Sequence, residues 1–232
     1  MAITVMRDEM DYLIHTCNQR EWYVNKYLIP SLIDQGIQSE DIMVWLDTEN
    51  KGNLHSCMES FSYCGKESGA TWHLQDDVIL CRDFAERIKK FDKDSIICGF
   101  CGVEVGPCIS RVGRVRPTQM WWSFQCIQIP NDLAKECSEW FYEDAIFRDN
   151  EEIANRIAGG KSDDWMFRRF ITESHPNVAI INYEPNLVDH IDYLLGGSVI
   201  NSARTRKHTS AYFKDKDLIQ ALEEKMKAEG DL

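Results

Sequence analysis

The chain has 232 residues, of which 44% are hydrophobic and 11% aromatic, enough for one large α/β domain with a substantial core. Its 26 basic and 38 acidic side chains give a net charge of −12, which argues against a broad nucleic-acid-binding surface. The sequence has no apolar run of transmembrane length and no signal-peptide pattern at its N-terminus. Nine cysteines, an odd number, are typical of reduced thiols, so we expect a cytoplasmic protein without a membrane segment.

The N-terminal part of the chain has the pattern of a βαβ unit. Ala2–Met6 and Ile42–Leu46 are apolar runs of strand length, and Trp22–Ile33 between them has helical spacing. Within that helix, Pro30 is expected to cause a bend or to separate two helical pieces. The first strand would bring Arg7, and the second Asp47, to the same edge of a parallel sheet.

Further elements extend this pattern. A turn-rich loop at Thr48–Asn53 opens onto a helix through Ser60–Tyr63, and Thr71–Gln75 has the composition of a third strand. A helix is then predicted over Asp83–Phe91, followed by short strands over Ser95–Gly99 and Val103–Val105. The fold class is therefore α/β, with a mostly parallel, Rossmann-like central sheet flanked by helices.

The second half of the chain is less regular. Its predicted elements are a loop or twisted hairpin over Gly106–Pro117, a strand within Met120–Ile129, helices over Pro130–Phe147, Asp163–Thr172 (with Ser162 as N-cap) and Asp217–Glu229, and a strand over Asn177–Tyr183. The last helix is amphipathic, with Leu218, Leu222 and Met226 on one face. We divide the domain at residue 105, into a half over 1–105 and an irregular half over 106–232.

Asp76 and Asp77 are adjacent carboxylates at the C-terminal end of the predicted third strand. Two such charges repel each other unless a cation lies between them, and Mg²⁺ or Mn²⁺ prefers oxygen ligands. Ligands of open α/β sheets bind beyond the carboxyl ends of the strands. The alternative is a solvated Asp-Asp turn, which this pair alone favours.

Two further polar segments combine with this pair. Asp163 and Asp164 begin a helix, where they either complement its dipole or act as a general base. His190 is either a core histidine or a metal ligand. Beyond it come Gly196-Gly197-Ser198 and the cations Arg204, Arg206 and Lys207, a set that could hold a diphosphate.

These segments together resemble a known family. The βαβ half that ends in Leu74-Gln75-Asp76-Asp77-Val78 resembles the acidic "DXD" element of GT-A fold nucleotide-sugar glycosyltransferases. Asp163-Asp164-Trp165 resembles the acidic motif that carries the acceptor-activating base in that fold, and Pro185–His190 resembles its C-terminal histidine element. The order and spacing fit one GT-A domain over most of the chain, similar to small bacteriophage-encoded glycosyltransferases, which would place the protein in a host cytoplasm.

The resemblance implies a role for each matched residue. Asp76, Asp77 and His190 would hold Mn²⁺ or Mg²⁺ against the donor diphosphate, and Asp164, with Asp163 beside it, would be the base of an inverting enzyme. A retaining enzyme requires no such base. The remaining donor-binding candidates are Arg7, Asp47, Gln75, Asp76, Ser198, Arg204 and Lys207. Gln75 stands where many members have an acidic residue, which puts its ribose contact in doubt.

The resemblance implies a metal-dependent, hexosyltransferase-like enzyme with a UDP-sugar donor and a hydroxyl acceptor. The acceptor could be a glycan, a protein or a modified DNA base. Trp121 and Trp122 are core residues or a stacking platform, and Trp165 is a third acceptor-side candidate. The three arginines Arg111, Arg114 and Arg116 could line a local nucleic-acid groove.

Two other functions remain open. A nucleotidyltransferase also uses paired carboxylates, a metal and a nucleotide on an α/β sheet, but it releases pyrophosphate. A non-catalytic nucleotide-binding module would use the same acids as turns and caps, and it would bind no metal.

Overall fold

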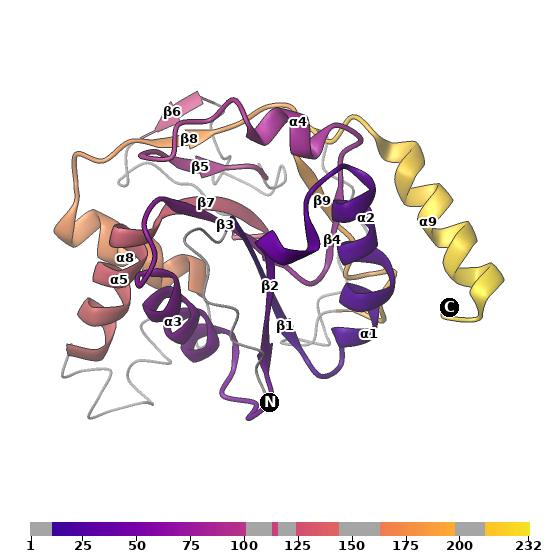
Figure 1. Cartoon of the computed structure of the whole chain (residues 1–232), viewed down its shortest axis with the longest axis horizontal. Helices are drawn as coiled ribbons and strands as arrows, with labels where there is room; N and C mark the ends of the chain where they lie inside the picture. Colours follow the sequence, from indigo (N-terminus) through magenta and orange to yellow (C-terminus); the bar gives the residue numbers. More distant parts are fainter. Residues whose placement is uncertain (1–10, 101–112, 116–123, 144–162, 198–211) are drawn as a thin grey trace.

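The computed structural model describes residues 11–100, 113–115, 124–143, 163–197 and 212–232. These residues form an α/β structure around one central sheet (Figure 1). The predicted strands over Ala2–Met6 and Val103–Val105 lie outside the described residues. No helix among the described residues is long and apolar enough to cross a membrane.

Seven strands of the described chain make up the central sheet. Their order is β2 (Ile42–Asp47), β1 (Tyr12–Cys17), β3 (Ala70–Gln75), β7 (Cys126–Pro130), β5 (Ile96–Cys98), β8 (Ile180–Asn182) and β6 (Gly113–Val115). Strands β1, β2, β3, β5 and β8 run in one direction, and β7 and β6 run antiparallel to them. The predicted, mostly parallel α/β sheet is confirmed, with antiparallel β7 inserted between β3 and β5.

Two predictions about the strands need correction. Tyr12–Cys17 forms β1, which the sequence pattern did not predict, and it pairs in parallel with both β2 and β3. The apolar run Ile42–Leu46 is typical of a buried strand, but every residue of β2 is only half-buried, because β2 lies at the edge of the sheet. Strand β1, buried at Leu13 and Ile14, is the inner strand of the βαβ unit.

One face of the sheet is covered by the helices that follow β1 and β4, together with the C-terminal helix. They are α1 (Glu21–Tyr23), the π-helix η1 (Val24–Leu28), α2 (Ile29–Asp34), α4 (Phe84–Ile88) and α9 (Lys216–Glu229). Val24, Leu28 and Phe84 pack with Ile14 and Leu74 in one core cluster. Pro30 lies in the first turn of α2, directly after the π-helical turn, where the N–H that a proline lacks breaks the regular pattern. The helical segment nevertheless runs without a break from Glu21 to Asp34, so Pro30 does not separate two helices.

The opposite face is covered by α3 (Asn53–Cys64), α5 (Asn131–Glu143) and α8 (Asp163–Ser174), which contact one another (Figure 1). Phe61, Phe141 and Phe167 form a second core cluster with strand residues such as Ile127. Side chains alternate between the faces of a strand, so neighbouring residues of β3 enter different cores.

Helix α9 lies at the periphery of the molecule (Figure 1). Ile219 and Met226 are its buried residues, and Leu222 packs beside them. The predicted amphipathic helix is therefore confirmed, but its apolar face centres on Ile219 rather than on Leu218. A pair of short strands, β4 (Val78–Leu80) and β9 (Val188–His190), completes the fold and leads to the candidate site.

Candidate functional site

Three parallel strands end together at one edge of the sheet. Cys17, the last residue of β1, lies opposite Asp47, the last residue of β2, and His15 lies opposite Gln75 at the end of β3. The chain then continues from β3 into Asp76 and Asp77. The acidic pair therefore lies at the carboxyl edge of the sheet, as predicted from the sequence, where α/β proteins bind their ligands.

The pairing of β4 with β9 brings His190 to Asp77. Val78 lies opposite His190 in this antiparallel pair, and the backbone oxygen of Asp77 accepts the N–H of Ile191 at 2.8 Å. The His190 Nε2 atom is then 2.9 Å from Asp77 Oδ2, and each side chain is only 18% exposed. Two residues that are 113 positions apart in the sequence thus form one polar contact at the sheet edge.

The carboxylates of Asp76 and Asp77 have different electrostatic environments. Burial and the neighbouring charge of Asp77 raise the pKa of Asp76 to about 7, although Thr16, Arg20 and the Cys17 amide oppose the shift. Burial also acts to raise the pKa of Asp77, but the charge and hydrogen bond of His190 outweigh it, so the pKa of Asp77 is lowered. At neutral pH the pair is therefore an anion with an incompletely balanced charge.

Cys17 holds Asp76 at the end of β1. The backbone N–H of Cys17 donates to Asp76 Oδ2 at 3.3 Å, and the Cys17 thiol lies 3.9 Å from the same oxygen. Asp76 is thereby directed toward β1, and its carboxylate does not join Asp77 and His190 in one close group of ligand atoms. The three predicted metal ligands thus share one edge, with Asp77 and His190 in direct contact.

One oxygen of the Asp77 carboxylate indicates whether a cation could bind at this edge of the sheet. Asp77 Oδ1 is buried and has no hydrogen-bond partner among the described residues. A buried carboxylate oxygen without a partner is costly unless a cation or donor completes it. Carboxylates suit Mn²⁺ or Mg²⁺, and an imidazole is a common ligand of divalent metals, so the residues present fit a divalent ion in chemical type.

Arg20 supplies a positive charge beneath this edge. Its side chain is only 2% exposed, and it lowers the pKa values of both Asp76 and Asp77. One guanidinium nitrogen, Nη2, donates to the backbone oxygen of Gly197, whereas Nη1 is buried without a partner in the described chain. Arg20 thus connects the turn after β1 to the segment after β9. Sequence reasoning missed it because it missed β1; a strand ending at Cys17 would have placed Arg20 at the carboxyl edge.

Gln75 connects the sheet edge to the second acidic pair. Its Nε2 lies 3.4 Å from Asp163 Oδ2, and Asp163 Oδ1 accepts the N–H of Asp164 at 2.9 Å in the first turn of α8. Burial and the charge of Asp164 raise the pKa of Asp163 to about 7. Asp163 is 5% exposed, whereas Asp164 is half-buried. The first turn of α8 therefore lies at the same carboxyl edge of the sheet as Asp76 and Asp77.

Asp47 lies at the predicted strand end and organises the next loop. Its Oδ1 and Oδ2 accept the backbone N–H groups of Lys51 and Gly52 at 3.0 and 2.9 Å. Of the other site candidates, Arg7, Trp121, Trp122, Ser198, Arg204 and Lys207 lie outside the described residues, as do Arg111 and Arg116. Arg114 lies in β6 and Trp165 lies in α8, but the structure describes only the backbone of these two residues.

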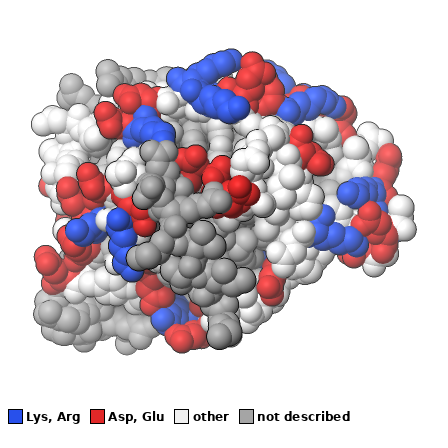
Figure 2. All heavy atoms as spheres, viewed as in Figure 1, with Lys and Arg blue, Asp and Glu red and all other residues white. Residues whose placement is uncertain are grey.

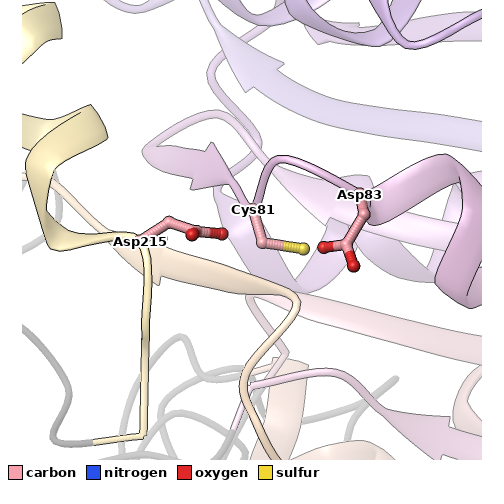
Figure 3. A group of neighbouring side chains, drawn as sticks. All are labelled: Cys81, Asp83 and Asp215. Carbon is pink, nitrogen blue, oxygen red and sulfur yellow. The ribbon is translucent and has the colours of Figure 1, made fainter.

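A separate group of ligand-type atoms lies where α4 and α9 begin. Cys81, Asp83 and Asp215 bring one such atom each to within 4.8 Å of the others and could hold a metal ion (Figure 3). Both carboxylates also face guanidinium groups, because Asp83 pairs with Arg87 at 2.8 Å and Asp215 with Arg82 at 3.1 Å. Burial raises the pKa of the Cys81 thiol to about 12, so at neutral pH it carries a proton that a metal must displace.

Charged side chains of both signs are interspersed over the face shown in Figure 2. The described residues form no continuous basic surface on that face. This distribution agrees with the net charge of −12, and it gives no sign there of the broad groove that a nucleic acid requires.

Comparisons with known proteins give little beyond this geometry. No protein-family model matches the chain, and no curated protein matches its sequence. A structural similarity is found to the glycosyltransferase GlyE of Streptococcus pneumoniae TIGR4, with 11% sequence identity and a TM-score of 0.40. The match covers 76% of this chain and 45% of that structure, so the chain spans less than half of its length.

Proposed function

We propose that this protein is a metal-dependent glycosyltransferase that moves a sugar, a hexose by the family resemblance, from a nucleotide-sugar donor to a hydroxyl acceptor. The observation that carries the proposal is the contact between Asp77 and His190, with a buried and unpartnered Asp77 oxygen beside it in the described chain. It lies where three parallel strands end, and it joins two of the motifs that resemble the GT-A family.

The proposed donor site is assembled from three separate segments. Asp77 and His190 would hold Mn²⁺ or Mg²⁺, with Asp76 completing the acidic edge. When bound, such an ion stabilises the negative charge that grows on the diphosphate as the bond to the sugar breaks. Arg20 adds a fixed positive charge beneath the carboxylates and anchors Gly197, which directly precedes the donor-site candidate Ser198.

The second acidic pair supplies the candidate base. Asp164 is the more exposed member and would accept the proton of an acceptor hydroxyl in an inverting reaction. Asp163, which is buried and bonded to Gln75 and to the Asp164 amide, would keep the first turn of α8 in place beside the donor. The donor would bind mainly to residues 1–105 and the acceptor to residues 106–232.

The donor nucleotide in this proposal is UDP. Arg7 and Asp47 are the proposed base-side contacts, with Ser198, Arg204 and Lys207 near the phosphates and Trp121, Trp122 and Trp165 near the acceptor. The sequence resemblance supports these assignments. The similarity to bacteriophage enzymes leaves a glycan, a protein and a modified DNA base as acceptor classes to be screened.

The proposal is tested by calorimetric titration of UDP into the wild type and Asp77→Asn, with and without Mn²⁺. We expect metal-dependent binding in the wild type and its loss in the variant. Asp83→Asn is the matched control, because it removes a carboxylate from the other candidate metal group, and it should bind UDP as the wild type does.

The products then separate the alternatives. A glycosyltransferase releases UDP from a UDP-sugar, whereas a nucleotidyltransferase releases pyrophosphate from a nucleoside triphosphate. If UDP, GDP, CDP and TDP all fail to bind with Mn²⁺ present, the glycosyltransferase proposal is wrong, and the acids act as turns and caps.

A further inference from the structure

The His190 ring lies between two carboxylates. Its Nε2 is 2.9 Å from Asp77 Oδ2, and its Nδ1 is 3.5 Å from Asp192 Oδ1. Asp192 is two residues further along the chain and only 2% exposed. A carboxylate this deeply buried is costly for the fold unless a cation or hydrogen-bond donors compensate its charge.

The fold itself gives little reason for a charge at Asp192. Its Oδ1 is buried and has no hydrogen-bond partner among the described residues, since 3.5 Å exceeds a normal hydrogen bond. The backbone oxygen of Asp192 accepts the N–H groups of Leu195 and Gly197, but any residue could provide that oxygen. Contacts of this kind in functional sites are often long before the ligand binds.

We propose that Asp192 is a positioning residue that holds the proton of His190 on Nδ1 and so leaves the Nε2 lone pair available to a divalent cation shared with Asp77. This inference rests on the proposed function, because it requires the cation. A neutral imidazole has one N–H and one lone pair, so the group beside one nitrogen decides what the other can do. Carboxylates that orient a metal-binding histidine in this way raise its basicity as a ligand.

Binding of Mn²⁺ alone, followed by electron paramagnetic resonance of the free ion, tests this role in the wild type and in Asp192→Asn. The amide has nearly the shape of the carboxylate but not its charge. We expect the Kd for Mn²⁺ to rise about 10- to 100-fold, as is typical when a partner of a metal-binding histidine is lost. The denaturation midpoint should not fall, because the variant removes a buried charge without removing a hydrogen bond found in the described chain.

Asp189→Asn provides the matched control. Asp189 is also buried and adjoins His190, and its Oδ1 accepts the backbone N–H of His190 at 3.0 Å. We expect its effect on the Kd to be much smaller than that of Asp192→Asn.

Two results would overturn the inference while the proposed function stands. The first is an unchanged Kd for Mn²⁺ in Asp192→Asn, with binding present in the wild type and lost in Asp77→Asn. The second is an equal loss of Mn²⁺ affinity and of stability in both the Asp192 and Asp189 variants, which would indicate a structural role. A wild type that binds no Mn²⁺ would overturn the metal-dependent function and this inference together.

Discussion

Two places in this protein gather metal-ligand residue types, and they differ in how their charges are balanced. In the group of Cys81, Asp83 and Asp215, arginines face both carboxylates. At the sheet edge, Asp77 keeps a buried oxygen without a partner in the described chain, and the pKa of Asp76 is raised. Closely spaced ligand atoms therefore do not by themselves mark the better cation site; the unbalanced charge at the sheet edge does so more clearly.

Arg20 and Arg82 provide the largest expected contrast in stability between the two places. Arg20→Met would leave buried carboxylates without their positive neighbour, so we expect a loss of about 3–5 kcal/mol in the free energy of unfolding. Arg82 is 53% exposed, and its ion pairs are screened by water, so Arg82→Met should lower the stability far less than Arg20→Met. Urea denaturation of both variants measures this difference, and equal losses would contradict the comparison.

Removal of one carboxylate from each place tests ligand binding. Asp77→Asn should weaken Mn²⁺ binding by about 100-fold or more, since loss of a direct ligand exceeds the effect of losing an outer partner. Asp83→Asn should leave the Kd for Mn²⁺ unchanged, because Arg87 already compensates that carboxylate. Calorimetry of the metal-free proteins is the measurement, and a larger effect at Asp83 would reverse the assignment.

The contributions of Asp163 and Asp83 to the free energy of unfolding should change in opposite directions as the pH rises. Burial and Asp164 raise the pKa of Asp163 from 3.8 to about 7, so the folded state favours the protonated form, and stability falls as the pH rises from about 4 through about 7. Asp163→Asn should remove this loss and increase stability at pH 8 by about 1–4 kcal/mol.

Arg87 lowers the pKa of Asp83, so its contribution is present above the unfolded pKa and is lost as the pH falls. Denaturation midpoints of Asp163→Asn and Asp83→Asn should be measured from pH 8 down to about pH 2, because the Asp163 slope lies between about pH 4 and 7 and the Asp83 slope lies below its unfolded pKa of 3.8. A flat difference between Asp163→Asn and the wild type across this range would contradict the raised pKa.

The smallest effect is expected at Cys81. Its thiol is buried and its pKa is raised to about 12, so little thiolate exists at neutral pH. Cys81→Ser should therefore change the affinity for Zn²⁺ or Mn²⁺ by less than about twofold, as measured by competition with a chelating dye. A loss of one tightly bound Zn²⁺ per chain in Cys81→Ser would instead make this group the principal metal site.

The sequence by itself determined the features that depend on neighbouring residues. Two strands and one helix were predicted in this way, because periodicity and capping act over a few residues. The signals were the apolar run at Ile42–Leu46, the β-branched and aromatic residues of Thr71–Gln75, and the acids that begin α8. For the same reason, the residue pattern alone was enough to place Asp76 and Asp77 at the end of a strand.

Only the tertiary structure decided which distant residues meet. The insertion of β7 beside β3, the contact of His190 with Asp77 and the burial of Arg20 each depend on strand pairing across long stretches of chain. Strand β1 was missed because its central His15 interrupts the apolar pattern, and that residue is buried against His73, with 3.0 Å between their ring nitrogens. Such contacts arise from the packing of the whole fold, and packing routinely overrides local preference.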